Sequence, residues 1–178
     1  MKPGEAKIFG VVGWSGSGKT TLMIELLPDL IRRGFRVSTM KHTHHNFDID
    51  KPGKDSFRHR EAGAHEVLIT GARRWALLHE NRDDPEPHID SLLANMAPVD
   101  LVLIEGFKSH SHKKLEVYRP SVGKEMIAAG DDSIVAVASD EPLPEIDVPV
   151  LDLNNVASIG DFVAGFCGLD RKARDGAA

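Results

Sequence analysis

The sequence predicts an α/β fold of the P-loop NTPase-like class, in which a mostly parallel sheet is flanked by helices and carries a β-hairpin insertion. Two features predict this fold. A glycine-rich segment near the N-terminus lies between a short apolar run and an amphipathic helical pattern, and a second apolar run at residues 101–104 ends in Glu105. Strands that are apolar throughout are typical of parallel sheets, because helices cover their faces.

The glycine-rich segment is the strongest motif of the chain. Residues 13–20, Gly-Trp-Ser-Gly-Ser-Gly-Lys-Thr, match the phosphate-binding pattern G-x-x-x-x-G-K-[ST]. Glycines let backbone N–H groups converge on phosphate oxygens, the lysine reaches the β- and γ-phosphates, and the threonine ligates Mg²⁺. A glycine-rich turn before an ordinary helix is the alternative, which the flanking strand and helix disfavour. The expected nucleotide-binding residues are Gly13, Ser15, Gly16, Ser17, Gly18, Lys19, Thr20 and Thr21.

Length, charge and cysteine content limit the class of protein. The 178 residues are expected to form one nucleotide-binding domain over 1–168 and a disordered tail over 169–178. A net charge of −5 supplies no basic surface, so nucleic acid is not an expected partner. The single cysteine, Cys167, excludes an internal disulfide and favours a reducing cytoplasm. The chain shows neither a signal-peptide pattern nor an apolar run that could span a membrane, so no membrane partner is expected.

Hydrophobic periodicity and turn residues predict the other elements. The first helix should cover residues 19–33, kink at Pro28 because proline removes a hydrogen bond, and end at Gly34. Gly71-Ala72 should form a tight hairpin turn, with glycine supplying a positive φ. Further strands are expected at 36–41, 65–70, 73–79, 100–106, 134–138 and 150–153, a half-exposed strand at 115–118, and further helices at 55–62, 88–96 and 158–166.

Two acids that follow predicted strands are candidate site residues. Glu105 ends a buried strand, and ligands bind at the carboxyl ends of strands in open α/β sheets, so Glu105 should hold Mg²⁺ directly or through water. Asp140 stands where many P-loop GTPases read the base, and its carboxylate could accept hydrogen bonds from guanine but not from adenine. A plain turn aspartate remains an equal alternative for Asp140, because the usual Asn-Lys-x-Asp motif is absent.

The long polar loop at residues 42–54 is a further candidate. Such loops close over the γ-phosphate in many P-loop proteins, so one of its acids could ligate metal or orient water; Asp50 is the candidate catalytic residue, with Lys19 and Glu105. Lys54 and Arg58 are candidates to neutralise phosphate charge. Solvated acids and surface cations are the alternative for these residues. The clustered histidines match no zinc framework, so contact with solvent or substrate is expected of them rather than a metal site: His42, His44, His45, His59, His110 and His112.

Four segments together resemble the MobB family, the accessory proteins of molybdopterin guanine dinucleotide biosynthesis. They are residues 13–21, 41–56, 62–64 and 104–108, with looser similarity at 138–140. The segment from Lys-His to Gly-Lys-Asp-Ser in 41–56 is the specific one. The resemblance implies a GTP-binding protein with weak Mg²⁺-dependent hydrolysis, and a homodimer in which two sheets join. It also implies partnership with MobA, the enzyme that joins GMP to molybdopterin, and raises molybdopterin as a direct ligand.

Three functions compete at this point. The first is a GTP-binding adaptor for cofactor guanylylation. The second is a metal-delivery GTPase, which usually offers cysteine with histidine, whereas Cys167 lies far from the histidine cluster in the sequence. The third is a small-molecule kinase, which should carry an arginine-rich lid that no stretch here clearly resembles. Related deviant P-loop ATPases place an additional lysine near Trp14, and its absence argues against that group.

Overall fold

The computed structural model describes residues 6–43, 47–143 and 146–169, and the chain divides into two compact units. Residues 1–42 and 98–178 form the first, here called the P-loop unit, and residues 43–97 form the second, here called the inserted unit. The sequence predicted one domain over 1–168, which stays a prediction. Of the predicted tail at 169–178, Leu169 packs against the core and the remainder lies outside the described residues.

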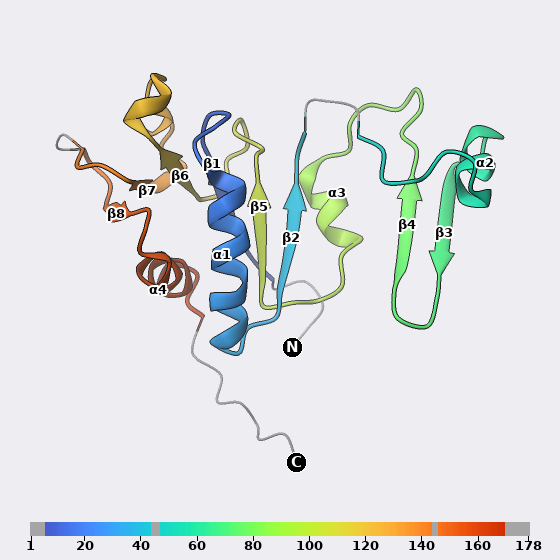
Figure 1. Ribbon diagram of the computed structural model, residues 1–178, viewed down its shortest axis with the longest axis horizontal. Helices are drawn as coiled ribbons and strands as arrows, with labels where there is room; N and C mark the ends of the chain where they lie inside the picture. Colours follow the sequence, from blue (N-terminus) through green and yellow to red (C-terminus); the bar gives the residue numbers. More distant parts are fainter. Residues whose placement is uncertain (1–5, 44–46, 144–145, 170–178) are drawn as a thin grey trace, which may run out of the picture. The chain divides into compact units, whose positions relative to one another are not determined.

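A six-stranded parallel sheet forms the centre of the P-loop unit, in the order β2-β5-β1-β6-β7-β8 (Figure 1). This arrangement confirms the predicted mostly parallel sheet. The carboxyl ends of β2, β5 and β1 are aligned, because Val11 and Lys41 both pair with Glu105. The strands are Lys7–Val12 (β1), Val37–Lys41 (β2), Leu101–Glu105 (β5), Lys114–Tyr118 (β6), Ile134–Ser139 (β7) and Val150–Asp152 (β8).

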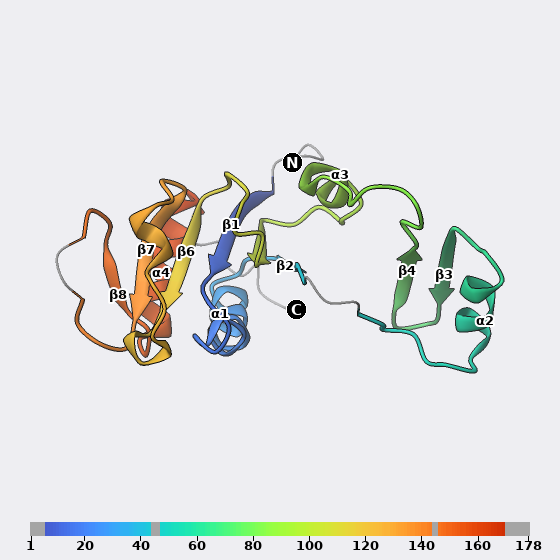
Figure 2. The ribbon, with the colours of Figure 1, turned by 90° about the horizontal axis from the view of Figure 1, so that it is seen from above.

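Two helices, α1 (Lys19–Arg32) and α4 (Val156–Phe166), pack on one face of this sheet (Figures 1 and 2). Every second strand residue points to this face and joins the core, as Phe9 and Leu103 do. α1 ends as predicted, with Gly34 at φ 94°, and it continues through Pro28. No helix among the described residues combines the length and the apolar character that crossing a membrane requires.

The connection from β5 to β6, residues 106–113, crosses β1 on the opposite face without a helix. The crossover and the first residue of β6 lie so close to β1 that a Cβ on Gly10 would be 2.6 Å from Nε2 of His112 and 2.7 Å from the Cβ of Lys114. A glycine is therefore required at this position because the crossover occupies the space of any side chain.

The strand predicted at 115–118 forms, but the prediction that it is half exposed is wrong. β6 is a central strand, and both Lys114 and Glu116 are 0% exposed. Lys114 Nζ donates to the Lys108 carbonyl at 2.9 Å and to Asp131 Oδ2 at 3.1 Å. Glu116 accepts two N–H bonds from the 3₁₀ turn η2 (Ile127–Ala129), which follows η1 (Pro120–Val122). Alternating polar residues usually indicate an exposed face, but here the charged side chains are buried with partners in the loops that cross the sheet.

The inserted unit consists of α2 (Asp55–Glu61), the antiparallel strands β3 (Glu66–Thr70) and β4 (Trp75–His79), and α3 (Ile89–Ala94). The predicted hairpin insertion is confirmed, but its turn is not the one expected. Gly71 donates its N–H to the Arg74 carbonyl, so the turn is centred on residues 72 and 73, and Gly71 does not use a positive φ.

Candidate nucleotide-binding site

The P-loop conformation depends on glycine at three positions of positive φ, Gly13 at 148°, Gly16 at 84° and Gly18 at 96°. Space is limiting as well at Gly13, where a Cβ would lie 2.4 Å from the Val117 carbonyl oxygen of β6. The loop therefore folds against the neighbouring strand in a way that other residues would disrupt.

The N-terminus of α1 is open to an anion. Gly18 occupies the N-cap position and supplies no side-chain cap, and the first turn contains no acidic residue. Its first N–H groups, which have no partner within the helix, and the positive end of the helix dipole therefore remain available. Ser15, Gly16 and Thr21 are exposed at this end, whereas Ser17 is 2% exposed and its hydroxyl is unpartnered among the described residues. This arrangement fits a bound phosphate group.

Side chains from three elements meet at Glu105, the last residue of β5. The sequence had placed Glu105 beside the P-loop, which contains Thr20. The Thr20 hydroxyl on α1 donates to Glu105 Oε1 at 2.8 Å, and Lys41 Nζ at the end of β2 lies 3.2 Å from the same oxygen. A hydroxyl and a carboxylate at this spacing are hard oxygen ligands of the kind Mg²⁺ takes beside a nucleotide phosphate. The residues therefore fit a Mg²⁺ ion.

Lys19 lies over the P-loop, where its Nζ donates to the Trp14 carbonyl oxygen at 2.8 Å. The pKa of Lys19 is lowered, first because burial disfavours its charge and then because the Lys108 and Lys41 ammonium groups repel it, while Glu105 partly offsets this. The ammonium of Lys108 lies 4.0 Å from the centre of the Trp14 ring. Three lysines thus gather where a polyphosphate would be bound.

Arg119 is a site residue that sequence reasoning missed. Its Nε donates to the Ser17 carbonyl at 3.0 Å, its guanidinium covers Gly18, and it forms an ion pair with Asp140. The Oδ1 atom of Asp140 is buried without a hydrogen-bond partner among the described residues. Because Arg119 follows the end of β6, beside β1, the rule that strand ends form the site could have identified it.

The acids of the long loop have partners inside the inserted unit. Asp50 Oδ1 accepts from the Ser56 hydroxyl at 2.8 Å and from the Lys51 N–H at 2.9 Å, and Asp48 pairs with Arg60 at 3.0 Å. Asp55 lies 3.8 Å from Arg58, with both side chains exposed. The catalytic role expected of Asp50 stays a prediction.

Histidines of the P-loop unit form a chain of ring contacts. His42 packs on Phe107 at 4.3 Å between ring centres, and Phe107 on His110 at 4.9 Å, while His44 and His45 lie outside the described residues. Across residues 6–43, 47–143 and 146–169, no three His, Cys, Asp or Glu side chains are grouped to hold a metal ion. Cys167 lies in the core, where burial raises the pKa of its thiol to about 11.

Comparison with known proteins agrees with this geometry. The family model for MobB, described as molybdopterin guanine dinucleotide synthesis protein B, matches residues 8–140. The chain is 42% identical over 161 residues to the molybdopterin-guanine dinucleotide biosynthesis adapter protein of Escherichia coli K12, covering 88% of this chain and 90% of that protein. The corresponding protein of Haemophilus influenzae is 43% identical over 159 residues, with 88% and 86% covered.

A solved structure shows the same fold. The crystal structure of a MobB protein homolog from Bacillus stearothermophilus matches with a TM-score of 0.67 at 27% identity, covering 92% of this chain and 99% of that one. The residues that match the family model include the P-loop, the strand that ends in Glu105 and Asp140. The chain therefore belongs to the MobB family.

Proposed function

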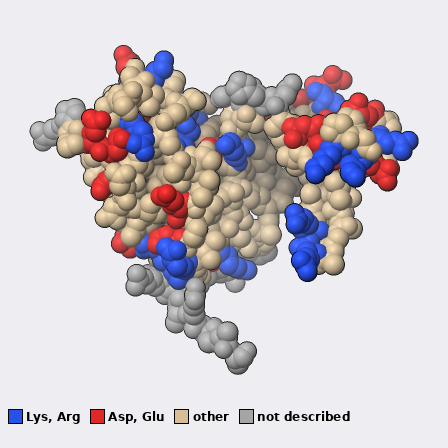
Figure 3. All heavy atoms as spheres, viewed as in Figure 1, with Lys and Arg blue, Asp and Glu red and all other residues tan. Residues whose placement is uncertain are grey.

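We propose that this protein is a GTP-binding accessory protein of molybdopterin guanine dinucleotide biosynthesis, acting in the cytoplasm with a MobA-type guanylyltransferase. The observation that carries the proposal is the open N-terminus of α1 beside the Thr20–Glu105 contact, in a chain 42% identical to the Escherichia coli adapter protein. The face seen in Figure 3 has acidic and basic side chains interspersed over the P-loop unit, which agrees with a net charge of −5. Over the P-loop unit, this face shows no concentrated basic patch of the kind that nucleic-acid binding uses.

Each site residue has a defined role in this proposal. The backbone N–H groups of the P-loop and Lys19 bind the β- and γ-phosphates, and Lys19 exchanges the Trp14 carbonyl for phosphate oxygens. Thr20 and Glu105 hold Mg²⁺, which neutralises phosphate charge when it is bound. Hydrolysis is slow, and Asp50 is the residue we assign to orienting the attacking water.

Asp140 is our candidate for selecting guanine. Its Oδ1 atom is a buried acceptor that has no hydrogen-bond partner in the described part of the chain, and Arg119 pairs with the other oxygen. A guanine N–H would satisfy this acceptor, whereas adenine presents an acceptor of its own at N1 and would leave it unpaired. The Asp140→Asn variant should therefore reduce the preference for GTP over ATP about tenfold, without weakening the binding of inorganic triphosphate as strongly.

The exposed hairpin supports a homodimer. Leu68, Trp75 and Leu77 lie on one face of β3 and β4 and are 62%, 65% and 42% exposed. Exposed apolar side chains on one face of a two-stranded hairpin are typical of an association surface, because such a hairpin is only marginally stable by itself. We propose a second copy of this chain as the occupant.

The direct test is calorimetric titration of the purified protein with GTP, ATP and molybdopterin, each with and without Mg²⁺. We expect Mg²⁺-dependent binding of GTP that is at least tenfold tighter than that of ATP. Tighter binding after addition of a MobA-type enzyme would support the partnership. Equal affinity for ATP and GTP, or no binding of either, would refute a GTP-dependent role.

Hydrogen exchange tests the long loop separately. Amides of residues 44–54 should gain protection when Mg²⁺ and a non-hydrolysable GTP analogue are added, and gain less with GDP, if this loop orders around the γ-phosphate. Residues 44–46 lie outside the described residues, so the readout that relates to known geometry is that of residues 47–54. Equal protection in all three states would remove Asp50 from the catalytic set.

A further inference from the structure

Trp14 belongs to the P-loop and contacts two lysines. Its indole N–H donates to the Glu125 carbonyl at 2.8 Å, which fixes the plane of the ring. Its carbonyl oxygen accepts from Lys19 at 2.8 Å, and its ring receives the ammonium of Lys108 at 4.0 Å. Both lysines thus contact the same residue through neutral partners, a carbonyl oxygen for Lys19 and an aromatic ring for Lys108.

The segment that carries Lys108 is built to hold it at this position. It begins directly after Glu105, and Gly106 and Phe107 both adopt positive φ, 98° and 52°, so the chain reverses sharply. A positive φ is uncommon at a residue other than glycine, and it persists only where surrounding contacts enforce it. The fully buried Lys114 supplies such a contact, since its Nζ donates to the backbone carbonyls of Lys108 and His110.

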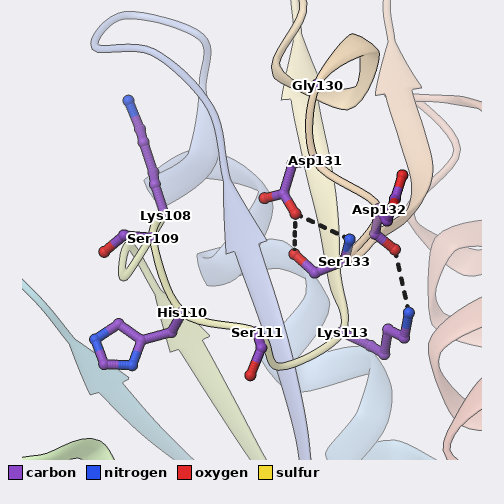
Figure 4. A pocket seen from close by; sticks show the side chains of 9 residues that line it. All are labelled: Lys108, Ser109, His110, Ser111, Lys113, Gly130, Asp131, Asp132 and Ser133. Atoms are coloured by element: carbon purple, nitrogen blue, oxygen red, sulfur yellow. Dashed lines mark hydrogen bonds between the residues drawn. The ribbon is translucent and has the colours of Figure 1, made fainter.

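Lys108 is one of the residues that line a pocket beside the crossover, but its ammonium lies at the Trp14 ring. This pocket, of about 560 Å³, is lined by residues of the crossover and by Asp131, Asp132 and Ser133. Figure 4 shows the Lys108 side chain extending away from these residues toward the P-loop. By contrast Lys113, at the other end of the crossover, donates to the Asp132 carbonyl at 3.1 Å.

We propose that Lys108 is a second phosphate-binding lysine of this site, which leaves the Trp14 ring to contact the terminal phosphate of a bound nucleoside triphosphate. The inference rests on the proposed function, because it assigns a further residue to the same site. Lys19 and Lys108 repel each other where they rest, so a polyphosphate placed between them relieves repulsion and gains two charge-assisted hydrogen bonds. A diphosphate would gain only the contact to Lys19, so Lys108 makes the site prefer the triphosphate.

The test compares Lys108→Met with Lys113→Met as the matched control from the same segment. Lys108→Met keeps the backbone carbonyl that Lys114 binds, so the crossover remains in place. We expect this variant to bind a non-hydrolysable GTP analogue about tenfold more weakly, with GDP affinity changed less than about threefold. Lys113→Met should leave both affinities unchanged, and Lys108→Arg should retain most of the affinity for the analogue.

Tryptophan fluorescence gives a second readout. The chain has two tryptophans, so a Trp75→Phe background leaves Trp14 alone, and its emission should shift when the analogue draws the ammonium away. Lys108→Met should show the shifted emission before any ligand is added. Wild-type affinity of Lys108→Met for the analogue, or an equal loss for the analogue and GDP, would overturn the inference while leaving the proposed function intact. A wild-type protein that binds no guanine nucleotide would overturn both.

Discussion

The P-loop unit and the inserted unit differ in how completely they bury their apolar side chains. Phe9, Leu103 and Leu115, on three strands of the P-loop unit, are each 0% exposed. In the inserted unit, the described apolar residues that are buried are Val67 and Ile89, while large apolar side chains of its hairpin remain exposed.

This difference separates two tasks. A six-stranded sheet with helices on one face and a crossover on the other supplies its own core, so it holds a site rigidly. A two-stranded hairpin cannot bury its own apolar face and needs a partner to do so. We therefore expect nucleotide binding to depend on the first unit and association to depend on the second, and the following experiments test that division.

The largest expected effect is that of Lys19→Ala. The loss of a lysine–phosphate contact worth about 3 kcal/mol should lower GTP affinity roughly 100-fold, because the P-loop N–H groups alone do not replace the charge. Calorimetry measures the affinity, circular dichroism checks the fold, and ultracentrifugation should show unchanged association. Wild-type affinity in a folded variant would refute the P-loop assignment.

Glu105→Gln should affect Mg²⁺ dependence and hydrolysis more than GTP affinity. The amide keeps the volume and the contact to Thr20 but loses the charge that Mg²⁺ requires, so hydrolysis should fall on the order of tenfold. Phosphate release at several Mg²⁺ concentrations measures this. Glu25→Gln, at an exposed position of α1, is the control, and equal behaviour of the two variants would make Glu105 a purely structural strand end.

Association should depend on the hairpin. Leu68→Ser combined with Trp75→Ser removes apolar surface that is 62% and 65% exposed in the isolated chain, and should raise the dimer dissociation constant at least tenfold. Sedimentation equilibrium measures it. Ile24→Ser is the matched control, since Ile24 is 66% exposed on α1 of the other unit. Loss of GTP affinity together with association would show that the two tasks are not separate.

Gly10→Ala should destabilise the P-loop unit by about 1–3 kcal/mol. The added Cβ would meet the His112 ring at 2.6 Å and the Lys114 Cβ at 2.7 Å, so the crossover must shift. Chemical denaturation measures the free energy of unfolding. Gly165→Ala in α4 has no atom within 4 Å of the new Cβ and should be neutral or stabilising. An unchanged free energy of unfolding in Gly10→Ala would mean that the crossover is not packed on β1.

The smallest expected effect is a loss of folding stability at low pH. Burial lowers the pKa of His112 to about 4, helped by the positive charges of Lys114 and His110 and opposed by Asp131. The unfolded chain takes up this proton near pH 6.5 and the folded chain only near pH 4, so the stability is complete above pH 6.5 and declines as pH falls toward 4. Allowing for solvent screening, we expect a loss on the order of 1 kcal/mol.

The acid effect is measured by unfolding at a series of pH values. His112→Gln should flatten the decline between pH 6.5 and 4.5, whereas His59→Gln, at an exposed position of α2, should keep the slope of the wild type. A wild-type slope in His112→Gln would show that other groups cause the acid sensitivity.

The sequence by itself determined most of the parallel sheet, the P-loop and the approach of Thr20 to Glu105. These features follow from local patterns, because apolar runs specify buried strands, glycines specify the phosphate loop, and strand ends of a parallel sheet meet at one edge. The hairpin was predicted for the same reason, although its turn is centred one residue later than the glycine suggested.

Only the tertiary structure decided which distant side chains complete the site. The hydrogen bond from Arg119 to the Ser17 carbonyl joins residues 102 positions apart in the sequence, and the one from Trp14 to the Glu125 carbonyl joins residues 111 positions apart. No periodicity in the sequence could indicate either contact. The burial of Lys114 was equally hidden, since its charge is typical of a surface and its partners are supplied by loops that cross the sheet. Local patterns fix which elements form, whereas the pairing of charges depends on how the loops between them return over the sheet.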